Sequence, residues 1–96
     1  MEILVTYDVN TETVGGRRRL RRVAKVCEGF GQRVQLSVFE CVVDSGNLAR
    51  LIHAIEQEID PSVDSLRIYR LKEPRAKYVT VLGRPLEFDQ REPLVF

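Results

Sequence analysis

The carboxylate with the greatest chemical potential in this chain is Asp8, which directly follows the apolar run Ile3-Leu4-Val5-Thr6-Tyr7. Such a run predicts a buried strand, and a carboxylate at a strand end combines a rigid support with access to a cleft. Two interpretations follow. Asp8 is a turn former that accepts hydrogen bonds from the next backbone amides, or it is a reactive group. The residues alone leave both open.

As a reactive group, Asp8 is suited to magnesium, which prefers oxygen ligands and keeps several of its waters. One carboxylate binds this ion weakly, but a two-fold axis can bring the Asp8 of a second chain close. One magnesium ion shared by two Asp8 side chains could activate water for attack on a phosphodiester. The sequence therefore makes Asp8 both the metal ligand and the catalytic residue of this hypothesis.

A second group of side chains suits the binding of phosphate. Seven of the 15 basic residues fall between positions 17 and 33, and the only acid among them is Glu28. Such a local cluster attracts a polyanion even though the net charge is only +1. The cluster also crowds the start of a predicted helix, where an anion would relieve the mismatch with the helix dipole. A merely solvated helix face is the alternative. The predicted nucleic-acid ligands are Arg17, Arg18, Arg19, Arg21, Arg22 and Arg33.

Other chemistries find little support in the sequence. The one histidine, His53, falls opposite the apolar stripe of a predicted helix, which argues against a histidine base. Cys27 and Cys41 lie in apolar segments without metal-ligand spacing, which predicts two buried thiols. No phosphate-binding glycine loop, dinucleotide motif or zinc motif is present in the sequence.

The elements that carry these residues follow from periodicity. A strand is expected over residues 2–8, then a loop with the sequence NTETVGG. A helix follows and ends near Glu28, with Gly29 or Gly31 as its left-handed closing residue. Its apolar stripe consists of Leu20, Val23, Ala24, Cys27 and Phe30.

The rest of the chain adds strands and one more helix. The segment GQRVQLSVFECVVD is extended, and periodicity does not decide between one strand and two that bend near residues 35–37. A second helix has its apolar stripe over residues 48–59 and stops at Asp60-Pro61. Further strands are predicted at 66–71 and 77–83. The order predicts an α+β, ferredoxin-like βαββαβ sandwich with an additional C-terminal strand, and with Leu4 and Thr6 on its uncovered face.

Length and composition indicate one small domain of 96 residues that gains from forming a homodimer. We expect a ferredoxin-like domain over residues 1–83, including the fifth strand, and an apolar tail over 84–96 that docks on the partner subunit. No segment is long and apolar enough to cross a membrane and no leader is recognisable, so a cytoplasmic location is expected.

Three stretches together resemble the small CRISPR-associated Cas-two family: TYDV, RRRLRRVAKVCEGFGQRVQLSVFE and LRIYRL. The resemblance covers most of the chain in the right order. It implies a ferredoxin-like dimer whose last strand crosses to the partner's sheet, two strands in place of one at 31–44, and magnesium on Asp8 at the dimer axis. The family's functional neighbourhood would comprise Tyr7, Asp8, Arg19, Arg21, Arg33, Ser37 and Phe39, in which Tyr7, Ser37 and Phe39 shape the cleft.

The resemblance also implies a function. We expect a magnesium-dependent endonuclease of single-stranded RNA or double-stranded DNA that acts in CRISPR adaptation and forms the central dimer of the complex with the Cas-one integrase. The rival hypothesis is a non-catalytic DNA scaffold for that integrase. An RNA-cleaving toxin of related fold is a third possibility.

Overall fold

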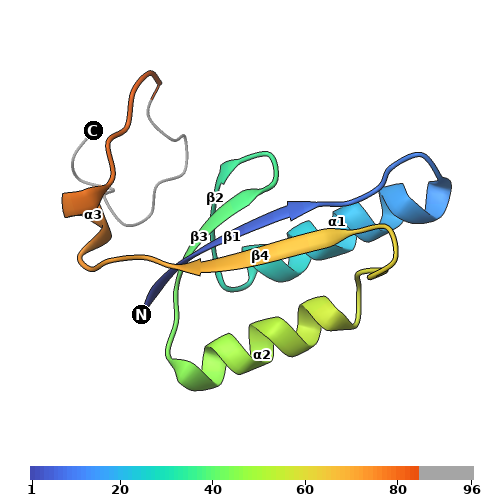
Figure 1. Ribbon diagram of the computed structural model, residues 1–96, viewed down its shortest axis with the longest axis horizontal. Helices are drawn as coiled ribbons and strands as arrows, with labels where there is room; N and C mark the ends of the chain where they lie inside the picture. Colours follow the sequence, from blue (N-terminus) through green and yellow to red (C-terminus); the bar gives the residue numbers. More distant parts are fainter. Residues whose placement is uncertain (85–96) are drawn as a thin grey trace.

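The computed structural model describes residues 1–84 of the chain. It is an α+β structure in which four strands and two long helices alternate, followed by one short helix (Figure 1). The elements are β1 (Glu2–Asp8), α1 (Val14–Glu28), β2 (Gly31–Gln35), β3 (Val38–Val42), α2 (Ser45–Glu56), β4 (Ser65–Arg70) and α3 (Arg75–Tyr78).

The four strands form one sheet in the order β2-β3-β1-β4, and every neighbouring pair is antiparallel. Helices α1 and α2 both lie on the same side of this sheet (Figure 1). The predicted ferredoxin-like βαββαβ arrangement is therefore confirmed. The segment that follows α1 forms two strands joined at Leu36 and Ser37, as the resemblance implied.

The core lies between the sheet and the two helices. Ile3, Val5 and Tyr7 of β1 are buried on the helix side, whereas Leu4 and Thr6 are only half-buried on the other face. This alternation follows from the period of two in a strand, and it confirms the predicted uncovered face. Other buried members come from the neighbouring strand and from both helices: Phe39, Cys41, Val23, Ala24, Cys27, Leu51 and Ile55.

Helix α1 begins earlier than the sequence suggested. The Thr13 side chain accepts a hydrogen bond of 2.9 Å from the Gly16 amide, so Val14, Gly15 and Gly16 belong to the helix and not to the preceding loop. A side chain at Gly16 would collide with the Asn10 carbonyl, since a Cβ atom there would lie 1.8 Å from that oxygen. Glycine thus allows the loop to pack directly on the helix.

The predicted end of α1 at Glu28 is correct, but the predicted left-handed glycine is wrong. Gly29 has a φ of −73°, and the helix closes with hydrogen bonds from Gly29 and Phe30 to carbonyls three residues back. Gly31 serves a different purpose in β2. A Cβ atom there would lie 2.3 Å from the Glu40 carbonyl oxygen of β3, so only glycine permits this strand pairing.

The fifth strand expected at 77–83 is absent from this chain within residues 1–84. Helix α3 takes Lys77 and Tyr78, and the chain then runs on beyond the end of the sheet (Figure 1). A strand requires a neighbour for its backbone hydrogen bonds, and the segment has none among the described residues. Val81 and Leu82 are accordingly 70% and 88% exposed. The predicted docking of the tail falls on residues 85–96, which lie outside the described part.

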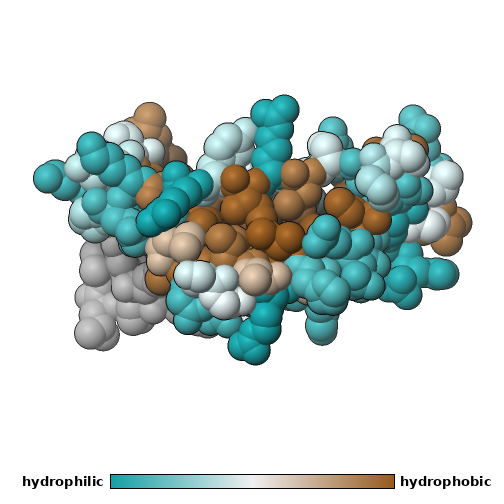
Figure 2. Space-filling view, turned by 60° about the horizontal axis from the view of Figure 1, so that its bottom comes forward, coloured by the Kyte–Doolittle hydropathy of each residue, from teal (hydrophilic) through white to brown (hydrophobic). Residues whose placement is uncertain are grey.

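The outer edge of the sheet carries an apolar groove. Strand β4 is an edge strand, and the groove between it and α2 is lined mainly by isoleucine and leucine. Apolar side chains also gather at the centre of the face seen in Figure 2. The groove residues are Ile52, Ile55, Glu56, Ile59, Leu66 and Ile68. Among the described helices, none is long and apolar enough to span a bilayer.

Candidate active site

A pocket of about 520 Å³ opens at the carboxyl end of β1, between α1 and the bend that joins β2 to β3. Its lining combines two acids, one of them at the strand end, with two arginines and an apolar wall. The lining residues are Tyr7, Asp8, Val9, Leu20, Arg21, Ala24, Glu28, Arg33, Leu36 and Ser37. The fold thus brings together side chains from β1, α1, β2 and the bend after β2, from Tyr7 to Ser37, which are 30 positions apart in the sequence.

Asp8 is the exposed last residue of β1 and contributes to the pocket wall. Strand β1 is paired on both sides, with Thr6 opposite Val38 and Asp8 opposite Ser65, so its end is held firmly. Within residues 1–84, no hydrogen bond or ion pair engages the Asp8 carboxylate. The turn is instead closed by Asn10, whose side chain accepts a hydrogen bond of 2.9 Å from the Glu12 amide. The structure therefore gives Asp8 no turn-forming role.

Two of the predicted phosphate ligands, Arg21 and Arg33, line the pocket from opposite elements. Arg33 lies 3.7 Å from Glu28, and both side chains are about half exposed, so this pair is weak and open to exchange with an anion. The Arg33 guanidinium also sits 5.2 Å from the centre of the Phe39 ring. The ring therefore supports the arginine without neutralising its charge.

The three residues expected to shape the cleft do so in different ways. Tyr7 and Ser37 line the pocket, and the Tyr7 amide donates a hydrogen bond of 3.1 Å to the Ser37 carbonyl. Phe39 is fully buried beneath them, with its ring centre 6.2 Å from that of Tyr7. Burial raises the pKa of Tyr7, so its hydroxyl stays protonated and donates to the Leu36 carbonyl at 3.4 Å.

Arg19 does not join this pocket. Its Nε lies 2.8 Å from Asp64 Oδ2, and its Nη2 lies 3.4 Å from Oδ1 of the same side chain. The Asp64 side chain is fully buried, and this hydrogen bond is the main cause of the raised pKa of Arg19. Arg19 therefore lies outside the pocket with its guanidinium held by a buried carboxylate, and its contact with nucleic acid stays a prediction.

The remaining predicted ligands lie on the outer surface of α1. Arg17, Arg18 and Arg22 are exposed and outside the pocket, and Arg17 donates a hydrogen bond of 3.2 Å to the Thr11 carbonyl. Because α1 begins at Val14, these arginines follow its first three residues, and the mismatch with the helix dipole is smaller than the sequence suggested. They form a basic surface beside the pocket.

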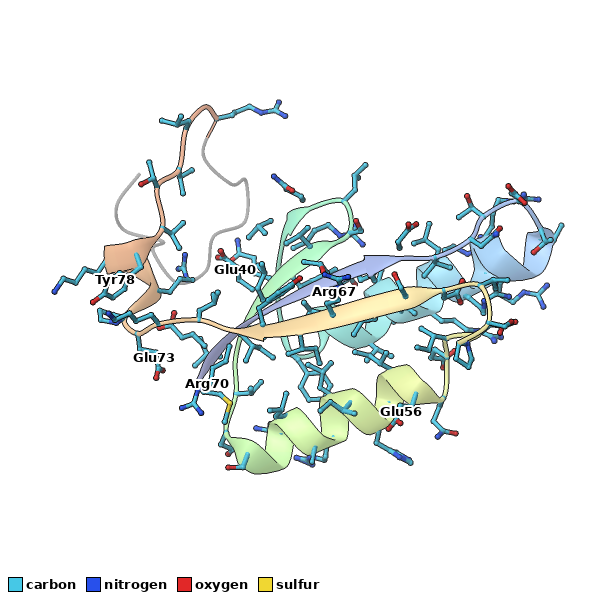
Figure 3. The ribbon with its side chains drawn as sticks, in the orientation of Figure 1. Glu40, Glu56, Arg67, Arg70, Glu73 and Tyr78 are labelled. Atoms are coloured by element: carbon cyan, nitrogen blue, oxygen red, sulfur yellow. The ribbon has the colours of Figure 1, made fainter. Side chains whose placement is uncertain are left out.

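Sequence reasoning missed two residues of this region. Asp64 is the only buried charged residue among those described, and it directly precedes β4. Arg67 of β4 stands opposite Thr6, on the sheet face that also carries Asp8, and lies over the middle of the sheet in Figure 3. Its position was readable from the alternation of SLRIYR, since the apolar Leu66 and Ile68 must face the core.

The described residues of one chain supply only part of the ligands that a magnesium ion requires. No group of three or more potential metal ligands exists within the described part of the chain. Magnesium is commonly held by one or two protein carboxylates, with water and substrate phosphates completing the octahedron. A free, exposed carboxylate beside two arginines matches that pattern if a second chain or a phosphate supplies the remaining oxygens. Cys27 is a poor alternative ligand, because burial raises the pKa of its thiol to about 12.

The fold and the pocket together define a small α+β protein in which an aspartate at the end of a central strand lies beside a basic helix. The model of the family described as CRISPR associated protein Cas2 matches residues 1–79. This chain belongs to that family.

Curated relatives extend over essentially the whole chain. The chain is 56% identical over 95 residues to the "CRISPR-associated endoribonuclease Cas2 1" of Moorella thermoacetica, with 99% of each chain covered. It is 49% identical over 96 residues to the "CRISPR-associated endonuclease Cas2" of Halalkalibacterium halodurans, with both chains fully covered. Among solved structures, Streptococcus pyogenes Cas2 at pH 6.5 matches with a TM-score of 0.79 and 52% identity, covering 86% of this chain and all of that one.

Proposed function

We propose that this protein is a metal-dependent endonuclease of CRISPR adaptation that cleaves phosphodiester bonds in RNA or DNA. The observation that carries the proposal is the free Asp8 carboxylate in the wall of a pocket that also contains Arg21 and Arg33. The names of the relatives, endoribonuclease and endonuclease, support the same activity.

Each group has a distinct task in this proposal. Arg21 and Arg33 bind phosphate oxygens from two sides, and the weak Arg33–Glu28 pair opens when the substrate enters. Asp8 holds magnesium, which when bound supplies an activated water and neutralises charge on the scissile phosphate. Arg17, Arg18 and Arg22 bind neighbouring phosphates along the strand, so that binding weakens as salt rises.

The site is completed by symmetry in this proposal. Two chains form a homodimer, in which both Asp8 side chains share one magnesium ion, and the Cas-one integrase binds that dimer. The free edge of β4, the apolar groove beside it and the exposed Val81 and Leu82 all favour association with a second copy. The segment after α3 would find in the partner's sheet the strand neighbour that it lacks within residues 1–84 of its own chain.

The test compares Asp8→Asn with a matched control on the same nucleic acids. Glu12→Gln removes an exposed carboxylate from the loop between β1 and α1, outside both the candidate active site and the apolar groove. Labelled single-stranded RNA and double-stranded DNA are incubated with each protein, with magnesium and with a chelator. We expect Asp8→Asn to lower the cleavage rate at least about 100-fold and Glu12→Gln to leave it within about twofold.

The same experiment decides between the nuclease and the scaffold. Cleavage that survives in Asp8→Asn, or that ignores the chelator, refutes the catalytic role of Asp8. A wild-type protein that binds DNA and supports integration with its integrase partner, but cleaves neither substrate with any divalent metal, favours the non-catalytic scaffold.

A further inference from the structure

We infer that Asp64 is a positioning residue that holds the Asp8 end of β1 against α1, so that the acid and the arginines of the pocket keep a fixed geometry. This inference rests on the proposed function, because it assigns a role in assembling the same site. Asp64 is outside the pocket lining and touches no part of a bound substrate in the proposal.

The Asp64 carboxylate joins three separate segments. Its Oδ1 accepts a hydrogen bond of 2.9 Å from the Asn10 amide, in the loop after β1. Its Oδ2 accepts 2.8 Å hydrogen bonds from Arg19 Nε of α1 and from the Asp60 amide, in the turn before β4. A single side chain therefore sets the relative position of the loop, the helix and the turn.

These contacts hold Asp8 from both directions along the chain. Asp8 itself pairs with Ser65, the residue after Asp64. Asn10, two residues after Asp8, donates its amide hydrogen bond to the Asp64 carboxylate. On the helix side, Arg19 is held two residues before Arg21, which lines the pocket. The distance between the Asp8 carboxylate and the arginine of α1 therefore depends on one buried network.

Burial makes the network specific. Burial alone would raise the pKa of Asp64, but the hydrogen bonds from Arg19, Asp60 and Asn10 outweigh it, and the pKa lies below its usual range. A buried carboxylate with these donors has few alternative arrangements, because each donor lost leaves an unsatisfied charge. An independent contact points the same way: the Asn10 carbonyl packs so closely on α1 that only glycine fits at position 16.

The test uses Asp64→Asn, which keeps the size of the side chain but removes its charge and points an amide toward groups that donate. Leu51→Ala is the control, since it removes a fully buried core side chain of α2 that does not contact the pocket. Binding of Mn²⁺, used as the probe ion, is measured for each full-length protein at a temperature where all remain folded. Amide hydrogen exchange at Asn10 is followed in parallel.

We expect Asp64→Asn to raise the Mn²⁺ concentration for half-saturation about tenfold and to speed exchange at Asn10, as loss of a supporting residue does in other metal sites. Leu51→Ala should leave Mn²⁺ binding within about twofold of the wild type, even if its melting temperature is as low as that of Asp64→Asn. If Asp64→Asn proves unable to fold, Arg19→Lys is measured in its place. It keeps the positive charge but loses the bidentate contact with Asp64, so we expect Mn²⁺ affinity to fall about threefold, which is half of the tenfold effect on a logarithmic scale.

The results separate this inference from the proposed function. If Asp64→Asn, or Arg19→Lys in its place, binds Mn²⁺ as tightly as the control, Asp64 only stabilises the fold and the inference is overturned. A wild-type protein that binds no Mn²⁺ overturns it as well. Weakened Mn²⁺ binding in Asp64→Asn without cleavage by any of the proteins refutes the nuclease and supports the positioning role.

Discussion

Asp8 and Asp64 are two aspartates at the same edge of one sheet, and they differ in almost every physical respect. Asp64 is buried and accepts hydrogen bonds from three segments. Asp8 stands opposite Ser65, the residue that follows Asp64, but its side chain is exposed and has no hydrogen-bond or ion-pair partner within residues 1–84. The fold supplies hydrogen-bond donors to the Asp64 carboxylate, whereas the Asp8 carboxylate remains accessible to a ligand. A strongly bonded acid beside an unbonded one is how a small domain can keep a reactive group rigidly placed.

The largest expected effect is the loss of stability when Asp64 is replaced. Asp64→Ala removes the shared acceptor of Asn10, Asp60 and Arg19, so we expect it to lower the free energy of unfolding by about 3 kcal/mol. Asp8→Ala should change it by less than about 0.5 kcal/mol, because no contact is lost. Chemical denaturation of both variants measures the difference. Equal losses would mean that Asp8 is also a structural residue.

Two adjacent glycines of α1 test how tightly the loop after Asp8 is packed. Gly16→Ala places a methyl group against the Asn10 carbonyl and should destabilise the protein by about 2 kcal/mol. Gly15→Ala has room, with its nearest contact at 3.7 Å, and should stabilise the helix by about 0.5 to 1 kcal/mol. Thermal unfolding measures both. A loop that tolerates Gly16→Ala would not be held in the way described.

Acid should remove the advantage of Asp64 over asparagine. The pKa of Asp64 in the folded protein lies below its ordinary value of 3.8, so its contribution is complete above that value and is lost as the pH falls through the folded pKa. The gap in unfolding free energy between wild type and Asp64→Asn should therefore be constant from about pH 7 to pH 5 and narrow below about pH 4. A gap that persists at lower pH would place the stabilisation elsewhere.

The smallest expected effect concerns the arginines that remain free. Arg33→Gln should reduce the dependence of log affinity for single-stranded RNA on log salt concentration by about 0.7, the value for one phosphate contact. Arg50→Gln on α2 is the control, since that exposed side chain lies outside the candidate active site. Fluorescence anisotropy at several salt concentrations measures the slopes. Equal slopes for the two variants would remove Arg33 from the nucleic-acid interface.

Much of the fold was predictable because periodicity and local signals agree along β1, α1 and α2. The resemblance to the family placed seven residues in one neighbourhood, and the structure brings five of them together in one pocket: Tyr7, Asp8, Arg21, Arg33 and Ser37. The separation of Arg19 from this pocket has a physical cause. Six arginines look equivalent in a sequence, and only the fold shows which one meets a buried carboxylate 45 residues away. The fifth strand predicted at 77–83 is not formed within residues 1–84, because sequence periodicity does not show whether a strand finds a neighbour for its backbone hydrogen bonds.

The central claim is that each chain supplies half of a metal site through Asp8, and mixing of subunits tests it most directly. Wild-type and Asp8→Asn chains are co-refolded in varied proportions at constant total concentration, and magnesium-dependent cleavage is measured. If both Asp8 side chains of a dimer are required, activity follows the square of the wild-type fraction and falls to about one quarter in an equal mixture. Activity of about one half in that mixture would show that each chain acts alone, and would contradict the shared site.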